Sequence, residues 1–290
     1  MLTVDRRWPV PRWLDNATFG TIGANWASQL MLAVTRGMSF LAANPEAPPE
    51  PAKPVPPITS RFYKPHPSFP QPAEIDSPLW RYLTVGKFVD LIWRHELWFS
   101  RLDRLGDPLE GSLGVPNALR QATDPVVQRN QLQLGSEQMR SHLFVSCWHL
   151  STHESAAMWA GYTHEQEAVA VRSTFRRLVE SIEGSDEFFA GEIAYGDHRQ
   201  TFVSEMNMFD RVMFKNTSFE HEREVRAVIA HSDDAALSPT GLRVPVNLET
   251  LIDRVHVAPT AAEWFLDVVT QLGSAFECPA PVVQSDMRID

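Results

Sequence analysis

The sequence predicts an α+β fold, built on a mixed, mainly antiparallel sheet with short flanking helices. From residue 79 onward, short segments with strand-like alternation are interspersed with short segments of helical spacing, and no repeated strand–helix–strand unit is visible. The 290 residues are 43% hydrophobic and 21% charged, which is the composition of an ordinary globular protein. We therefore expect one large domain with an appendage.

Three parts are expected along the chain. Residues 1–44 form a helical N-terminal appendage, because their apolar residues recur near one helical face, at Trp26, Leu30, Val34 and Leu41. Residues 45–78 hold about half of the 22 prolines, which favours an extended linker or a strap over the surface. Residues 79–290 form the α+β domain.

The strands of this domain are expected where apolar and polar residues alternate. They are residues 79–84, 97–102, 142–150, 168–175, 191–197, 223–231 and 253–259. The helices are expected at residues 85–96, 152–162, 175–182 and 261–273, with residues 116–141 helical in part. Thr84 is a candidate N-cap for the first of these helices, and Ser151 with Glu154 is a candidate capping box for the second.

Charge and cysteine content bear on the binding partners of the protein and on its cellular compartment. The formal charge is −10, so general nucleic-acid binding is not expected, because phosphate contacts need a positive field. The two cysteines, Cys147 and Cys278, lie far apart, which is typical of the reducing cytoplasm. Asn25, Gln29 and Arg36 interrupt the most apolar early stretch, so neither a targeting signal nor a membrane span is expected.

The segment "FEHEREVRAV" (219–228) concentrates charge next to an apolar run. On a strand, Glu222, Glu224 and Arg226 would share one face, and the apolar residues after them would share the other. The charged face is either a solvated surface or the wall of a site.

Arg81, in "LWRYL", lies on an otherwise apolar strand face. A buried guanidinium needs a partner or a ligand. Glu222 and Glu224 are candidate partners in an Arg–Glu pair across strands, which would be structural. Alternatively, the planar fork of Arg81 binds a phosphate group.

Other residues allow a structural and a functional interpretation. Trp159 and Tyr162 either fill the core or line a pocket for a planar ring. The turn-rich loop "DRLGDPLEGS" (103–112) is either a tight loop or a pocket rim. Cys147, His149 and His153 could ligate zinc, but their spacing is unusual, and no metal is expected.

Five blocks together resemble a family of bacterial proteins, Domain of Unknown Function 2971. They are "LWRYL" (79–83), "GDPLEGS" (106–112), "VSCWHLSTHESAAMW" (145–159), "AVAVRSTFRRL" (168–178) and "SFEHEREVRAVI" (218–229). Residues 1–78 lie outside this resemblance.

A second resemblance is to ADP-ribosyltransferases of the Arg–Ser–Glu class. Their order of motifs is met by Arg81, then Ser173-Thr174, then Glu222-x-Glu224, with Ser146 as an alternative to the Ser-Thr pair. This resemblance implies that Arg81 holds the phosphates of NAD and that the serine motif supports the nicotinamide side. It also implies that Glu224 binds the nicotinamide ribose as its glycosidic bond breaks, and that an unknown macromolecule accepts the ADP-ribose.

Two other functions stay open from the sequence. One is a metal-dependent hydrolase or nuclease that would use Asp103, Asp107, Glu110, His149 and His153. The other is a non-catalytic sensor or interaction protein of a phage-defence or toxin system, in which the charged residues form a structural ion-pair network.

Overall fold

The computed structural model of the protein describes residues 57–124, 136–162, 167–184, 186–205, 207–231 and 240–287. The chain from Pro57 onward forms one compact unit. The helix expected within residues 1–44, and residues 45–56 of the proline-rich segment, lie outside the described residues.

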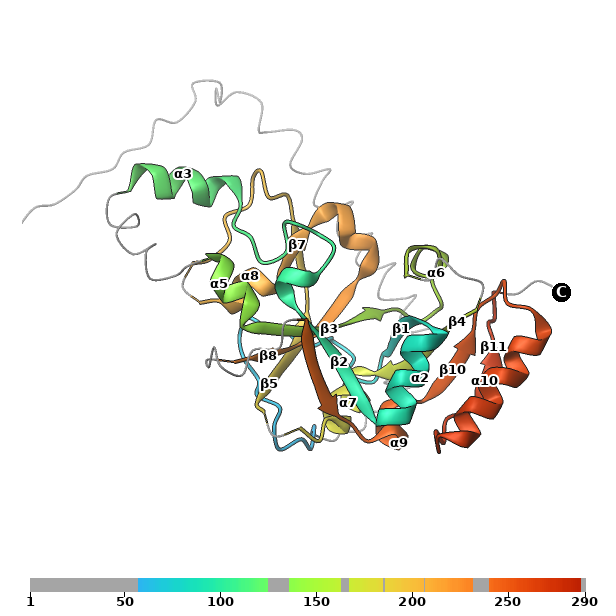
Figure 1. Cartoon of the computed structure of the whole chain (residues 1–290). Coiled ribbons are helices and arrows are strands. Elements are labelled where there is room, and N and C mark those ends of the chain that lie inside the picture. Colours follow the sequence, from blue (N-terminus) through green and yellow to red (C-terminus); the bar gives the residue numbers. More distant parts are fainter. Residues whose placement is uncertain are drawn as a thin grey trace, which may run out of the picture. The chain divides into compact units, whose positions relative to one another are not determined.

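The protein has an α+β fold with a mainly antiparallel sheet and short helices, as the sequence predicts (Figure 1). The strands are β1 (Pro78–Thr84), β2 (Glu96–Arg101), β3 (Leu143–Leu150), β4 (Ala168–Thr174), β5 (Phe188–Glu192), β6 (Ala194–Gly196), β7 (Phe214–Asn216), β8 (Glu224–Ala230), β9 (Gly241–Pro245), β10 (Arg254–Val257) and β11 (Val282–Gln284). The α-helices are α2 (Val85–Arg94), α3 (Val115–Thr123), α5 (Ser136–Ser141), α6 (Ala156–Tyr162), α7 (Phe175–Ser181), α8 (Phe209–Val212), α9 (Leu248–Leu251) and α10 (Glu263–Ala275). Two 3₁₀ helices, η1 (Leu102–Arg104) and η3 (Thr217–Glu222), complete the described elements.

The large sheet is organised around β3. Its strand order is β11-β10-β4-β1-β3-β2-β9, and β8 joins β3 to β5. β8 pairs with one edge of β3 over the whole of residues 143–149. The opposite edge pairs with β1 at its C-terminal end (residues 149–150) and with β2 near its start (residues 144–145). Between these two contacts β1 and β2 diverge, so this edge of β3 is left without a strand partner at residues 146–148.

The core follows from the apolar faces of the predicted elements. The helical stripe of α2, formed by Phe88, Leu91 and Ile92, is buried, as the sequence predicts. The apolar face of β8 is buried as well, with Val225, Ala227 and Ile229 at most 1% exposed. Burial of such side chains supplies the main driving force for this fold.

Glu222 and Glu224 do not lie on one strand, contrary to the prediction. Glu222 is the last residue of η3, and Glu224 is the first residue of β8. Arg223 between them has φ 39°, in the left-handed region, and so turns the chain between the two glutamates. Their carboxylates nevertheless meet, as described below.

The predicted capping box is also wrong. Helix α6 begins at Ala156, after both proposed capping residues. The Ser151 hydroxyl accepts a hydrogen bond from the backbone N–H of His153 at 3.2 Å, and the Glu154 carboxylate binds side chains of His256, Ser285 and Trp159. The alternation expected over 191–197 divides between β5 and β6, which belong to different sheets.

The described part of the proline-rich segment packs on β5. Lys64 N–H donates to the Phe188 carbonyl at 2.9 Å, and Phe188 N–H donates to the Phe62 carbonyl at 3.1 Å. Phe69 is 2% exposed, and its backbone lies so close to Gly191 that a Cβ there would come within 2.5 Å of the Phe69 carbonyl carbon. Residues 62–69 thus lie along β5.

In the part of the chain that the structure describes, we find no helix with the length and apolar character needed to cross a membrane.

Candidate functional site

A cavity of about 750 Å³ opens where β1 and β2 diverge from β3. Its walls come from β1, β2, β3 and β8, from the loop that follows η1, and from α6 and η3. Cavities of roughly 300–1,000 Å³ are typical of sites for small organic ligands. The side chains of Arg81, Tyr162, Glu222 and Glu224 all line it, so four of the predicted site residues share one cavity.

Arg81 is held by neutral groups. Its Nη1 donates to Ser146 Oγ at 2.6 Å, and its Nη2 donates to the Trp98 carbonyl at 3.0 Å. The guanidinium also lies 5.6 Å from the centroid of the Trp148 ring. Within the described part of the chain, no Asp or Glu oxygen lies within the 4.0 Å distance of an ion pair with Arg81. Of the two alternatives left open by the sequence, the structural pair of Arg81 with Glu222 or Glu224 is therefore not formed.

This environment makes Arg81 a candidate anion-binding group. Burial lowers the pKa of Arg81 to about 10, so the side chain still carries its charge at neutral pH. A guanidinium has five N–H donors, of which the two bonds to Ser146 and Trp98 use two. The remaining donors and the uncompensated charge suit a phosphate group that enters the cavity.

The two predicted glutamates belong to a buried charge cluster, which we define as Glu110, Lys215, Glu222, Glu224 and Arg226. All five residues are at most 7% exposed. Lys215 Nζ lies 2.5 Å from Glu222, 3.2 Å from Glu224 and 3.3 Å from Glu110. Three carboxylates thus share two cations in this cluster.

Arg226 fixes two of these carboxylates. Its Nε and Nη2 donate to the two Glu224 oxygens at 2.6 and 3.0 Å, and its Nη1 and Nη2 donate to the Glu110 oxygens at 3.1 and 3.2 Å. Burial alone would raise the pKa of Glu224, but the charges of Arg226 and Lys215 lower it to about 2. Glu224 is therefore an ionised carboxylate of fixed orientation at neutral pH.

Glu222 is connected to helix α6. The Tyr162 hydroxyl donates to Glu222 Oε1 at 3.0 Å, while Lys215 binds the other oxygen. Tyr162 is 47% exposed and lines the cavity, in agreement with a ligand-facing position. Trp159 is different, because its ring packs on Tyr82 with centroids 4.9 Å apart and its Nε1 donates to Glu154. Trp159 is thus a core residue behind the cavity wall.

Of the two serine positions proposed from the sequence, the structure places only Ser146 next to Arg81. Ser146 Oγ accepts from Arg81 and, at 3.2 Å, from Trp148 Nε1. Ser173 Oγ donates to the Leu251 carbonyl at 2.5 Å, away from the cavity. Thr174 is the N-cap of α7, where its hydroxyl accepts from Arg177 N–H at 3.1 Å. The geometry gives Ser173 and Thr174 structural roles in place of the predicted contact with a cofactor.

The residues proposed for a metal do not converge. Asp103 is bound by Arg101 at 2.7 Å, Glu110 belongs to the charge cluster, and His149 Nδ1 lies 2.6 Å from the Glu222 carbonyl oxygen. Burial raises the pKa of the Cys147 thiol, so it is a poor nucleophile and ligand. Among the described residues, the group of metal-ligating type that does converge is Glu154, His256 and Asp286.

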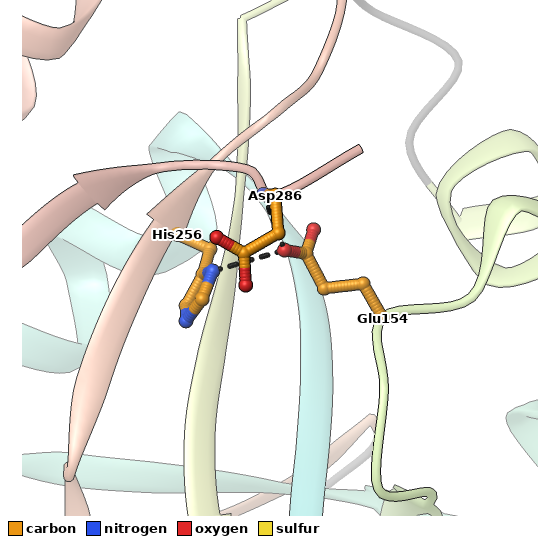
Figure 2. A group of neighbouring side chains, drawn as sticks. All are labelled: Glu154, His256 and Asp286. Carbon is orange, nitrogen blue, oxygen red and sulfur yellow. Dashed lines mark hydrogen bonds and ion pairs between the residues drawn. The ribbon is translucent and has the colours of Figure 1, made fainter. Parts of the chain in front are cut away.

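Figure 2 shows this group, in which Glu154 reaches His256 and the backbone N–H of Asp286. Glu154 Oε1 accepts from His256 Nδ1 and Asp286 N–H, both at 3.0 Å. Glu154 Oε2 accepts from Trp159 Nε1 at 3.0 Å and from Ser285 Oγ at 2.6 Å. Four donors therefore saturate the carboxylate, which ties β10 and the C-terminal segment to the start of α6.

We expect Glu154→Gln to lower the free energy of unfolding by about 2–3 kcal/mol. The amide NH2 of glutamine takes the place of one carboxylate oxygen, so its N–H donors would face the two donors that this oxygen now accepts from. Burial alone would raise the pKa of Glu154, but its hydrogen bonds, that from His256 being the largest, lower it to about 2 from an ordinary 4.5. A lowered folded-state pKa means that this stabilisation is complete above about pH 4.5 and is lost as the pH falls toward 2. Urea unfolding between pH 3 and pH 7 measures both effects.

The matched control is Glu187→Gln. Glu187 forms a surface pair with Lys64, its side chain is 67% exposed, and its loss is expected to change stability by less than about 0.5 kcal/mol. Equal unfolding free energies for the wild type and Glu154→Gln would contradict a structural role for this carboxylate.

Two features of the site were missed by sequence reasoning. Lys215 was not proposed at all, although a single lysine in the apolar run "RVMFKN" needs a buried partner. The sequence predicts only a strand position for Trp98, which lines the same cavity as Arg81. Glu110 was proposed for a metal, whereas it neutralises Arg226.

Comparisons with known proteins give a distant likeness of fold. No family model matches the chain, so the resemblance to Domain of Unknown Function 2971 is not confirmed. No curated protein matches it either. Two solved structures of an ADP-ribosyltransferase, DarT from Thermus sp. 2.9, are similar. The structure with carba-NAD+ has 10% identity and a TM-score of 0.35, and the match covers 72% of this chain and 95% of that chain.

The second DarT structure, in complex with ADP-ribosylated ssDNA, has 9% identity and a TM-score of 0.35, with 76% of this chain and 99% of that chain covered. It corrects one expectation. The acidic net charge of −10 argued against general nucleic-acid binding, but a protein of distantly similar fold is found with single-stranded DNA. A net charge does not decide this point, because the field inside a cleft depends on the charges that line it.

Proposed function

We propose that the protein binds NAD in the cavity between β1, β2 and β3, cleaves the nicotinamide glycosidic bond and transfers ADP-ribose to an acceptor. One observation carries this proposal: a partly buried arginine without a carboxylate partner among the described residues shares a cavity with two fixed carboxylates. Such a cavity offers positive charge for phosphates and negative charge for a developing ribose cation.

Arg81 binds the pyrophosphate through the N–H donors that Ser146 and Trp98 leave unused. The departure of nicotinamide breaks the bond between its ring nitrogen and C1′ of the ribose, and the electron pair leaves with the neutral nicotinamide. The ribose then resembles an oxocarbenium ion. Glu224 stabilises this charge without reorganisation, because Arg226 and Lys215 already hold its oxygens.

Glu222 lies beside Glu224 through their shared partner Lys215, and Tyr162 orients its second oxygen. We place Glu222 at the acceptor side, where a carboxylate positions an attacking hydroxyl or amine and takes up its proton. The new bond joins this nucleophile to C1′, so the products are nicotinamide and the ADP-ribosylated acceptor.

The test uses the purified full-length chain with NAD, and with cell lysate and single-stranded DNA as separate acceptors. We expect nicotinamide release that depends on an acceptor, and a melting temperature that rises with the NAD concentration by mass action. A protein that neither binds nor consumes NAD with any of these acceptors would overturn the proposal. Binding without consumption would favour a nucleotide sensor.

A further inference from the structure

Trp98 presents an aromatic ring to the cavity. It lies on β2, is partly exposed, and belongs to the cavity lining. Its Nε1 donates to Ser100 Oγ at 3.1 Å, so the polar edge of the indole already has a partner on the same strand. What the ring can offer a ligand is therefore its apolar surface.

Strand β9, whose Arg243 also lines the cavity, contacts this ring. Arg243 is the cross-strand neighbour of Trp98, and its guanidinium lies 5.3 Å from the ring centroid. Asp90 holds Arg243 in place at 2.6 Å. The ring also lies directly against Gly241, where a Cβ would overlap Cζ2 and come within 2.8 Å of Cε2. The indole is thus fixed in position before any ligand arrives.

The ring also has a defined place relative to the groups of the proposed reaction. The backbone carbonyl of Trp98 accepts from Arg81 Nη2 at 3.0 Å, so the guanidinium lies next to the Trp98 backbone, and both residues line the cavity. Glu224 lies on the other side of β3, where it pairs with His149. Because neighbouring strands are about 4.8 Å apart, Trp98 on β2 and Glu224 on β8 are separated by at least two strand spacings. The order across the cavity is Trp98, Arg81, Glu224.

We propose that Trp98 is the stacking platform for the adenine base of the dinucleotide, an inference that rests on the proposed function. If the pyrophosphate binds Arg81 and the nicotinamide ribose binds Glu224, the adenosine half extends to the side where Trp98 lies. Every nucleobase has a π face, and a fixed aromatic ring binds it without requiring a particular hydrogen-bond pattern. The order of Trp98, Arg81 and Glu224 across the cavity thus matches the order of adenine, pyrophosphate and nicotinamide ribose along the dinucleotide.

The experiment compares ligands that contain or lack adenosine. The affinities of the full-length chain for NAD, ADP-ribose and nicotinamide mononucleotide are measured by calorimetry, for the wild type and for Trp98→Ala and Trp98→Phe. We expect Trp98→Ala to lower the affinities for NAD and ADP-ribose by about tenfold or more and to leave the affinity for nicotinamide mononucleotide unchanged. Trp98→Phe keeps an aromatic face and should retain most of the affinity. Trp93→Ala is the matched control, since Trp93 is 59% exposed on α2 and does not line the cavity.

Gly241→Ala is a second probe, because an added Cβ would overlap Trp98 Cζ2 and the Phe99 carbonyl oxygen, so the ring and the neighbouring backbone of β2 would both shift. It should lower the affinity for ADP-ribose, as Trp98→Ala does. The inference would be overturned if Trp98→Ala lost equal affinity for nicotinamide mononucleotide and ADP-ribose, or lost affinity for neither. A wild type that binds ADP-ribose through Trp98 but does not cleave NAD would retain the inference and refute the proposed reaction. A wild type that binds none of the three ligands would refute both.

Discussion

Glu224→Gln is expected to lower the rate of NAD consumption by about 100-fold or more while NAD binding is largely retained. The glutamine keeps the shape of the side chain but removes the charge that stabilises the ribose cation. Because that charge acts in the transition state and not in the ground state, the effect should fall on kcat and leave KM nearly unchanged. Nicotinamide release at saturating NAD measures it.

The control for this substitution is Glu110→Gln. Glu110 contacts the same two cations as Glu224, at 3.1 Å from Arg226 and 3.3 Å from Lys215. Its substitution removes the same charge from the same buried cluster and should have a similar cost in stability. We expect its kcat to stay within about tenfold of the wild type, because the reaction proposed here assigns Glu110 no contact with the ribose. Equal losses of kcat in both variants would show that the rate depends on the cluster as a whole, against a specific role for Glu224.

The sequence predicts the fold class and the core better than it predicts the site. Strand alternation and helical spacing are local properties, and they identify the buried faces of α2 and β8 correctly. The convergence of Arg81 and Glu224 on one cavity agrees with the order of motifs in the sequence. Their partners could not be derived, because Ser146, Trp98 and Lys215 come from three other strands.

Two outcomes have a common physical cause. Charge alone leaves a pair between Arg81 and a glutamate open, but the register places Glu224 on the opposite edge of β3, next to Arg226 and Lys215. The Ser173-Thr174 pair fits a motif, but the two hydroxyls are hydrogen-bonded to the backbone of helices α9 and α7. Such outcomes depend on tertiary register, which no short window of sequence contains.

Arg81→Met is expected to abolish the rise in melting temperature that NAD produces, while the melting temperature without ligand stays the same or increases. Arg81 is partly buried and has no carboxylate partner among the described residues, so removing its charge also removes a desolvation cost. That gain offsets the loss of the hydrogen bonds to Ser146 and Trp98, and we expect a net change within about 1 kcal/mol.

Arg226→Met provides the contrast. Arg226 also lines the cavity, but we expect its substitution to lower the stability of the protein. Its side chain is fully buried and paired with Glu110 and Glu224, so methionine would leave two carboxylates with only Lys215 as a cation. Breaking a buried pair in this way costs about 3–5 kcal/mol. Thermal unfolding of both variants with and without NAD separates the two roles. If Arg81→Met were as destabilising as Arg226→Met, Arg81 would be a structural residue, and the cavity would lose its assigned phosphate-binding group.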